Sequence, residues 1–393
     1  MSSPNDTDPL PSSVPAHRAA KSRPWFWLRA AVVLLVLAGV AARWNSTTGF
    51  TSLIRFGSDF EATRLPEIKA LPLAVVPGSG YDGQFYAQIA VAPDVTSPAL
   101  KTALDQPSYR ARRILLPLAA HLLGSGRPWW ILQAYALLNP VAWLALVWLW
   151  WRQLGIDSVR GMGVWLACLL SLGALDSVRL ALTDLPMVLA LTLAVSALQR
   201  RRYGLAALGF IAAGFVRETA VLAVQPLGAV DNLPQRRQAW FRAAACIFPV
   251  ALWCGWLAYR LPGTSHGVEG NLGWPGLGLG RHLATCLQAL WSGDFESRYT
   301  FGLVGALGLA FQSVFLICRW RENDPWMRIG LAFACLFWFL GDFVWHGYWA
   351  AARACLPMTF AFNLRLLKEP RFALSFATGN FFAVHGLIRF LPF

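Results

Sequence analysis

The sequence predicts an all-α protein, a bundle of transmembrane helices with about ten or eleven spans. Three observations lead to this fold class. Of the 393 residues, 56% are hydrophobic and only 14% are charged, whereas about a quarter of the residues in soluble domains are charged. Several apolar runs exceed about 18 residues, the length that crosses a bilayer as a helix. Many of the 20 tryptophans flank these runs, as interfacial anchors do.

The first predicted span is Trp25–Trp44. It follows residues 1–24, which are rich in Ser, Pro and Asp and which we expect to be a disordered cytoplasmic terminus. Because no small-residue cleavage site follows a short apolar core, we expect this span to be retained. Residues 25–393 then form a single membrane domain. Its further apolar runs are Trp129–Trp151, Val164–Leu175, Leu180–Leu198, Leu205–Phe215, Thr219–Ala229, Ala243–Ala258, Thr300–Ile317, Ile329–Phe343, Trp349–Leu366 and Phe372–Leu387.

Basic residues between the apolar runs set the orientation. The net charge of +14 would suggest nucleic-acid binding in a soluble protein, but here the charge lies in short clusters typical of cytoplasmic membrane loops. These clusters begin at Arg152, Arg200, Arg236, Arg319 and Arg365. Four segments are then extracytoplasmic. They are the long first outer loop 45–113, the turn Asp176–Asp184, the outer loop 260–299 and the turn Gly341–Tyr348.

The same rule predicts a broken hairpin between two of the clusters. The chain must leave and return between the arginines at 200–202 and those at 236–242. Leu205–Phe215 and Thr219–Ala229 are therefore expected to be two short segments, with Arg217 and Glu218 at the outward turn. Broken helices at membrane depth occur where they line a cavity or lie buried in protein. A run at Ile114–Leu123 is also too short to cross alone at about 1.5 Å per residue.

The most informative motif is Tyr-Asp-Gly-Gln-Phe-Tyr at residues 81–86, in the first outer loop. Asp82 and Gly83 indicate a turn or an N-cap that opens a short helix. Apolar residues at helical spacing then predict an amphipathic helix on the outer membrane face. A capped interfacial helix with no catalytic role would show the same pattern as a helix that carries a functional residue.

This motif resembles the first outer loop of GT-C superfamily membrane glycosyltransferases, especially PIG-V-like mannosyltransferases. It is still more similar to a bacterial family of cell-surface glycopolymer formation. The likeness continues through residues 105–117, at Leu182–Pro186, at Val216–Thr219 and at Arg353 before Leu356-Pro357, and so covers most of the chain. The resemblance implies a fold of GT-C type, a polyprenyl-phosphate sugar donor, inversion at the sugar carbon and an active face outside the cytoplasm, in the bacterial inner membrane.

The chemistry of such a transfer assigns roles to residues. An acceptor hydroxyl needs a general base, and Asp82 is the candidate. Negative charge grows on the leaving phosphate, and guanidinium groups stabilise it with paired hydrogen bonds. The predicted substrate-binding residues are Tyr81, Gln84, Tyr86, Asp105, Tyr109, Arg110, Arg112, Arg113, Asp184, Arg217, Glu218 and Arg353.

Structural explanations remain open for several of these residues. Arg217 and Glu218 could compensate each other as a buried pair. Asp184 could cap the helix that follows it, and Arg112 and Arg113 could anchor a helix end at lipid headgroups.

Neither a metal nor another cofactor is predicted. His266 and His346 have no second ligand at metal-binding spacing, and the seven cysteines form no CxxC pair. The expected partners are the lipid-linked donor, a glycan, lipid-linked saccharide or protein acceptor, and membrane lipids. Two rival functions remain: a flippase or transporter of lipid-linked sugars, and a non-catalytic scaffold for envelope-polymer assembly. The lack of an internal repeat and the long aromatic first outer loop disfavour the transporter.

Overall fold

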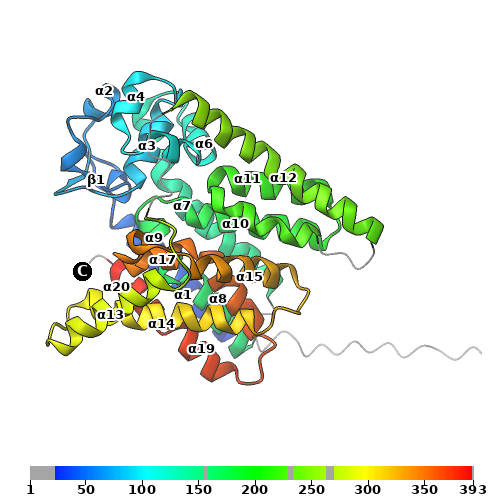
Figure 1. Cartoon of the computed structure of the whole chain (residues 1–393). Coiled ribbons are helices and arrows are strands. Elements are labelled where there is room, and N and C mark those ends of the chain that lie inside the picture. Colours follow the sequence, from blue (N-terminus) through cyan, green and yellow to red (C-terminus); the bar gives the residue numbers. More distant parts are fainter. Residues whose placement is uncertain (1–22, 155–157, 229–232, 263–269, 392–393) are drawn as a thin grey trace, which may run out of the picture.

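The computed structural model describes residues 23–154, 158–228, 233–262 and 270–391 (Figure 1). Helices dominate it, which confirms the predicted class at this level. The described residues contain one small sheet, in which β1 (Phe56–Gly57) pairs in parallel with β2 (Val75–Val76). The predicted disordered terminus, 1–24, lies outside the described residues except for its last two, which begin α1 (Arg23–Ala41).

Three helices in the described ranges are long and apolar enough to cross a membrane. They are α7 (Pro128–Gln153), the segment Arg237–Arg260 of α12 (Leu233–Arg260), and α14 (Ser297–Ile317). A fourth span results if α8 (Val159–Leu169) and α9 (Leu172–Arg179) are counted as one helix bent by 42°. These helices support a membrane protein, whereas ten or eleven spans stay a prediction.

Some apolar runs that the sequence suggests as single spans are pairs of shorter helices. One run forms α17 (Tyr348–Ala354) and α18 (Leu356–Leu366), which meet at Cys355. Pro357, which has no amide hydrogen to donate, lies in the first turn of α18, where none is needed. The last run likewise divides into two helices. These are α19 (Phe372–Asn380) and α20 (Ala383–Phe390).

The broken hairpin predicted from charge is present. After α10 (Asp184–Gln199), helix α11 (Tyr203–Val216) ends where Arg217 becomes extended, at φ −155° and ψ 122°. A 3-10 helix, η3 (Glu218–Gly228), follows and packs against α11, α12 and α15 (Pro325–Trp338). A 3-10 run of this length is uncommon, and such segments often mark strain or a functional site.

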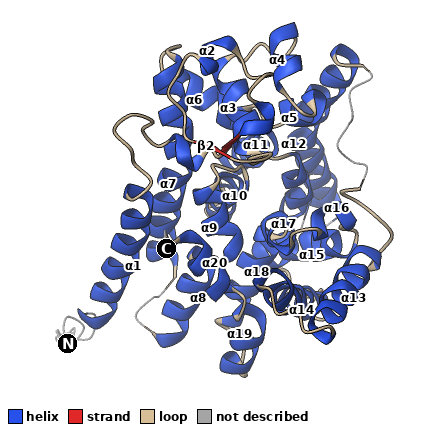
Figure 2. Ribbon diagram, turned by 90° about the vertical axis from the view of Figure 1, so that its left-hand side faces the viewer, coloured by secondary structure: helices blue, strands red, loops and turns tan. Residues whose placement is uncertain are grey.

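The first outer loop forms a helical cap at one end of the molecule (Figure 2). At its centre lies α3 (Gly83–Val91), where residues 83–90 are all buried. The predicted amphipathic helix on the membrane surface is therefore wrong, because α3 is covered by α6 and α7 as well as by other parts of the loop. The remaining elements of this region are η1 (Thr51–Leu53), η2 (Ser58–Phe60), α2 (Pro66–Lys69), α4 (Pro98–Ala103), α5 (Pro107–Ala111) and α6 (Leu115–Leu123).

Two other segments predicted to be extracytoplasmic lie together. The segment before α13 (Leu277–Trp291) pairs with the turn before α16 (Asp342–Trp345) through a bridge between Leu272 and Leu340. The amide of Gly341 donates to the carbonyl of Asn271 at 2.8 Å. Residues 263–269 of the predicted outer loop 260–299, which include His266, lie outside the described residues.

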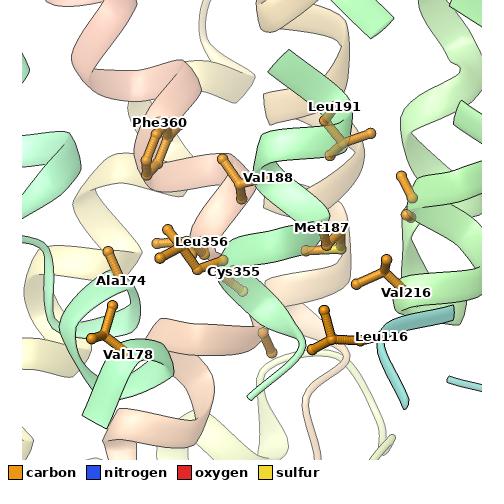
Figure 3. Packing of buried hydrophobic residues seen from close by; sticks show 14 of the residues in the cluster. Leu116, Ala174, Val178, Met187, Val188, Leu191, Val216, Cys355, Leu356 and Phe360 are labelled. Carbon is orange, nitrogen blue, oxygen red and sulfur yellow. The ribbon is translucent and has the colours of Figure 1, made fainter. Parts of the chain in front are cut away.

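A continuous apolar core joins the cap to the helices below it. Leu116 from α6, Met187 from α10 and Val216 from α11 pack near Leu356 at the start of α18 (Figure 3). All four are buried. The core therefore holds the ends of α10, α11 and α18 in fixed positions beneath the cap, and these ends carry the polar residues described next.

Gly83 allows α3 to approach the turn before α10. A Cβ at this position would overlap the carbonyl oxygen of Leu180 and would lie 2.9 Å from the carbonyl oxygen of Ile54. Both obstacles are backbone atoms, so no side chain can rotate away. The glycine of the 81–86 motif is therefore required by the close contact between cap and helices.

We predict that Gly83→Ala lowers the free energy of unfolding by about 1–3 kcal/mol, the usual cost of overpacking. The matched control is Gly204→Ala in α11, where a Cβ meets nothing within 4 Å. Thermal unfolding of the two purified variants measures the difference. Equal melting temperatures would show that the cap can shift away from Leu180.

Candidate active site

Asp82 lies at the N-terminal end of α3, and its carboxylate contacts an arginine instead of capping the helix. It occupies the N-cap position but accepts no capping hydrogen bond. Its Oδ1 lies 3.0 Å from Nη2 of Arg110. Arg110 also donates to both oxygens of Asp105, at 2.9 and 2.7 Å. The Asp82 side chain is 34% exposed, so its carboxylate remains accessible within this ion-pair group.

Arg113 ties the cap to the turn between α11 and η3. It donates to both oxygens of Glu218, at 2.9 and 2.8 Å, across 105 residues of sequence. Its remaining contacts are with the hydroxyls of Tyr86 and Tyr109. All three guanidinium nitrogens are thus engaged, and the side chain is buried. An anchoring role for Arg113 at lipid headgroups is therefore wrong.

Asp184 is the fully buried first residue of α10, and two arginines converge on it. Arg217 forms an ion pair with its Oδ1, and Nη1 of Arg353 lies 3.6 Å from its Oδ2. Arg353, from α17, also donates to the hydroxyl of Tyr81 at 2.8 Å. Arg217 and Glu218 therefore pair with different residues, and the suggestion that they compensate each other is wrong.

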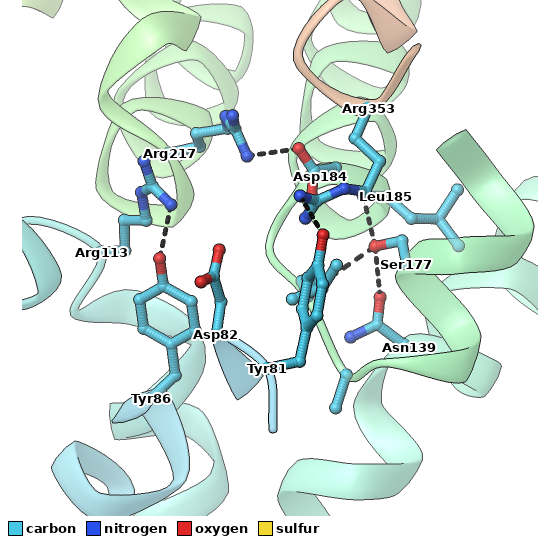
Figure 4. Close-up of polar contacts among 12 residues, drawn as sticks. Tyr81, Asp82, Tyr86, Arg113, Asn139, Ser177, Asp184, Leu185, Arg217 and Arg353 are labelled. Carbon is cyan, nitrogen blue, oxygen red and sulfur yellow. Dashed lines mark hydrogen bonds and ion pairs between the residues drawn. The ribbon is translucent and has the colours of Figure 1, made fainter. Parts of the chain in front are cut away.

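The turn that presents Asp184 has its own polar support (Figure 4). The hydroxyl of Ser177 donates to Oδ1 of Asn139 and accepts the amide of Leu185. Ala181 has a positive φ of 47°, which is unfavourable for a residue with a side chain. The hydroxyl of Tyr135 donates to its carbonyl at 2.9 Å, and this contact helps to hold the strained turn in place.

Figure 4 shows Asp82 between Tyr86 and Tyr81, pointing into the space below Arg217 and Arg353. Within the described part of the chain, Nε of Arg112, Nε of Arg217 and Nε of Arg353 are buried without a hydrogen-bond partner. Buried polar groups are normally hydrogen-bonded. Arg217 and Arg353, which both contact Asp184, therefore keep unused guanidinium donors that an anion could engage.

The ionisation of Asp82 reflects these arginines. Burial opposes the charged form, but the positive charges of Arg110 and Arg353 outweigh it and lower the pKa of Asp82 to about 2. A carboxyl with a depressed pKa is ionised at every pH well above that value. Asp82 is therefore an anion at neutral pH, ready to accept a hydrogen bond or a proton.

The other predicted residues differ in whether their polar atoms are free to contact a substrate. Gln84 is fully buried and uses its amide to accept from Gly57 at 3.1 Å and to donate to Ser79 at 2.8 Å, so it shapes the loop. Arg112 is half-buried near the ring of Tyr109. The remaining predicted residues all belong to the three ion-paired groups above, which meet around Asp82.

Several residues near the site were missed from the sequence. Trp349 lies next to Tyr81, and Arg389 lies 4.4 Å from the centre of the Trp349 ring. Asp176 pairs with Arg179 and Arg389. Asp176 and Arg179 lie at the end of α9, so the turn predicted at Asp176–Asp184 begins later than expected. No local signal marks Arg389, which follows an apolar run.

A cavity of about 390 Å³ lies beside this group and shares Trp349 with it. Its walls include Tyr299, Trp345, His282 and Arg281. Cavities of about 300–1,000 Å³ are the size of small-molecule sites. In the described residues, no group of three or more His, Cys, Asp or Glu side chains is placed to hold a metal ion.

Comparisons of the chain with protein-family models, with curated proteins and with solved structures each found no match.

We predict that Glu218→Gln destabilises the fold more than an exposed carboxylate change does. It leaves the buried guanidinium of Arg113 without a counter-charge, which typically costs about 3–5 kcal/mol. Glu61→Gln, at an exposed residue of the first outer loop, which also contains Arg113, is the control. In thermal unfolding, the melting temperature should fall clearly for Glu218→Gln and stay unchanged for Glu61→Gln. Similar melting temperatures would mean that Arg113 is neutralised by another group.

Proposed function

We propose that this chain is a membrane glycosyltransferase of GT-C type, which moves a monosaccharide from a polyprenyl-phosphate donor to an extracytoplasmic acceptor. The observation that carries the proposal is the placement of one accessible carboxylate, Asp82, among guanidinium groups with unused donors. Transfer of a sugar from a lipid phosphate needs both parts: a base for the acceptor hydroxyl, and fixed positive charge for the leaving phosphate.

The reaction assigns a role to each group. The acceptor hydroxyl oxygen attacks the anomeric carbon of the donor, and the bond from that carbon to the phosphate oxygen breaks. The hydroxyl proton passes to Asp82, and the electron pair of the broken bond stays on polyprenyl phosphate. Arg217 and Arg353, whose Nε atoms are unpaired, stabilise that anion. Direct displacement inverts the sugar carbon.

Donor binding would strengthen Asp82 as a base. With a pKa of about 2, the carboxylate holds a proton weakly, because nearby arginines favour its charged form. A donor phosphate placed against those arginines offsets their charge and raises the pKa of Asp82. The base therefore becomes more effective when the donor is present. In the empty site, its low pKa keeps it unprotonated.

The spatial grouping of charged loops supports an active face on one side of the membrane. Residues from the first outer loop, from the turn before α10, from the α11–η3 junction and from α17 meet at Asp82. Three of the arginine clusters assigned to the cytoplasm meet elsewhere. There Arg319 pairs with Glu369 at 2.7 Å, Arg160 donates to the carbonyl of Glu369, and Arg365 pairs with Glu322. The proposed location is the bacterial inner membrane, with the active face extracytoplasmic.

The central prediction is that Asp82→Asn abolishes sugar transfer while the protein still folds. Asn keeps the shape, and Arg110 keeps its paired contacts with Asp105. Loss of a general base commonly lowers the rate by about 10²–10⁴. The measurement is transfer from labelled polyprenyl-phosphate sugars in reconstituted membranes, beside thermal unfolding.

The matched control is Asp59→Asn, the same change at an exposed residue of the first outer loop, which should leave transfer intact. A folded Asp82→Asn protein with near-normal turnover would refute the catalytic role. A flippase would move lipid-linked sugars across the membrane in this assay and form no new glycosidic bond. A scaffold would do neither.

The proposed orientation predicts opposite labelling of two exposed positions. Ser292 follows α13 on the predicted outer side, and Asn323 lies between α14 and α15 on the predicted inner side. In a background with the exposed Cys318 and Cys335 changed to Ser, a membrane-impermeant maleimide added to intact spheroplasts should modify Ser292→Cys. Asn323→Cys should react only after the membrane is opened. The reverse pattern would place Asp82 in the cytoplasm.

A further inference from the structure

A second group of arginines lies next to the Asp82 site. It consists of Arg43, Arg55, Arg179 and Arg389, and it surrounds Asp176. Arg179 donates to Oδ1 of Asp176 from Nε and Nη2, at 3.3 and 3.0 Å. Nε of Arg389 lies 3.7 Å from the same oxygen. These residues come from the loop after α1, from α9 and from α20.

Arg43 and Arg55 belong to the same group, because the positive charges of its other members act on them. Burial and the charges of Arg179 and Arg389 lower the pKa of Arg55. Arg179 and Arg55 act in the same way on Arg43, whose Nη2 donates to the carbonyl of Phe390 at 3.1 Å. The charge of Arg179 thus disfavours the charged forms of both Arg43 and Arg55.

The charges of this second group are unbalanced. Within the described ranges, Asp176 is the one carboxylate in ion-pair contact with these arginines, so four positive charges face one negative charge. The site around Asp82, the first site, is balanced, because Arg110, Arg113, Arg217 and Arg353 pair with Asp82, Asp105, Asp184 and Glu218. Half-buried guanidinium groups without counter-charges are costly, and a bound anion would remove that cost.

The second group is placed to serve the same reaction. The carbonyl of Arg55 accepts the amide of Tyr81, the neighbour of Asp82, at 3.1 Å. Arg389 stacks on Trp349, which lies next to Tyr81. All four arginines are half-buried, so they are partly shielded from water yet reachable by a ligand.

We propose that Arg43, Arg55, Arg179 and Arg389 bind the diphosphate group of a lipid-linked saccharide, which is the acceptor of the transferred sugar. This inference rests on the proposed function. The donor is a phosphodiester with one negative charge, which suits the balanced first site. A diphosphate diester carries two negative charges, which suits a site with a surplus of three positive charges. Guanidinium groups bind phosphate oxygens with paired, charge-assisted hydrogen bonds.

The test measures binding without sugar transfer, so that it can be read even if the chain transfers no sugar. The purified full-length protein is titrated at constant ionic strength with farnesyl diphosphate and with inorganic diphosphate. The variants are Arg43→Gln, Arg55→Gln and Arg389→Gln, each checked by thermal unfolding. Arg298→Gln, on an exposed arginine of the predicted outer loop 260–299, is the control for general surface charge, and Arg217→Ala reports on the first site.

We expect each cluster variant to weaken binding of farnesyl diphosphate by about tenfold to a hundredfold, as loss of a charge-assisted contact does. Arg298→Gln should bind it normally. Unchanged affinity in every folded cluster variant would overturn the proposal, as would an equal loss in Arg298→Gln. A loss of affinity confined to Arg217→Ala would show that the diphosphate binds at the first site. If the wild-type protein bound inorganic diphosphate as tightly as farnesyl diphosphate, the cluster would be a site for a free anion and not for a lipid-linked acceptor.

Discussion

Burying a guanidinium group without a counter-charge costs several kcal/mol, and the site around Asp82 buries Arg110, Arg113 and Arg353. Each can be buried only where a carboxylate or hydroxyl meets it. Arg113 finds Glu218, and Arg353 finds Tyr81 and Asp184. Because these partners belong to different segments, charge pairing requires the cap, the turn before α10, the α11–η3 junction and α17 to meet. The apolar core brings the segments together, and the ion pairs fix their register.

This constraint also explains which residues remain free to act. All three guanidinium nitrogens of Arg113 donate hydrogen bonds within the fold. The side-chain amide of Gln84 is likewise hydrogen-bonded within the loop. Asp82 is more exposed than Glu218, which is 20% exposed against 34% for Asp82. Arg217 and Arg353 retain buried Nε groups without partners. The division between residues that hold the site and residues that can meet a ligand therefore follows from how completely each side chain is paired.

The helix break that charge patterning predicted at Arg217 is present. The prediction placed two arginine clusters on one side of a membrane, which requires the chain to return between them. The helical spacing of apolar residues led to a wrong prediction for α3. Its apolar residues fit an amphipathic surface helix, but the polar residues on its other face are glutamines that the loop itself satisfies. Gln88 accepts the amide of Leu65 and donates to the carbonyl of Ala103. A polar face can point to solvent or to enclosed backbone, and sequence spacing does not distinguish the two.

The sequence alone determined the helical class, the membrane-length helices, the turn at Arg217 and the residue types gathered near Asp82, since these depend on local composition and on the sign of nearby charges. Only the tertiary structure decided which arginine pairs with which carboxylate. Arg113 and Glu218 are 105 residues apart, and Arg353 and Tyr81 are 272 apart. The cluster around Asp176 joins the loop after α1 to the last helix. Pairings over such separations arise from the packing of whole elements, and no local pattern encodes them.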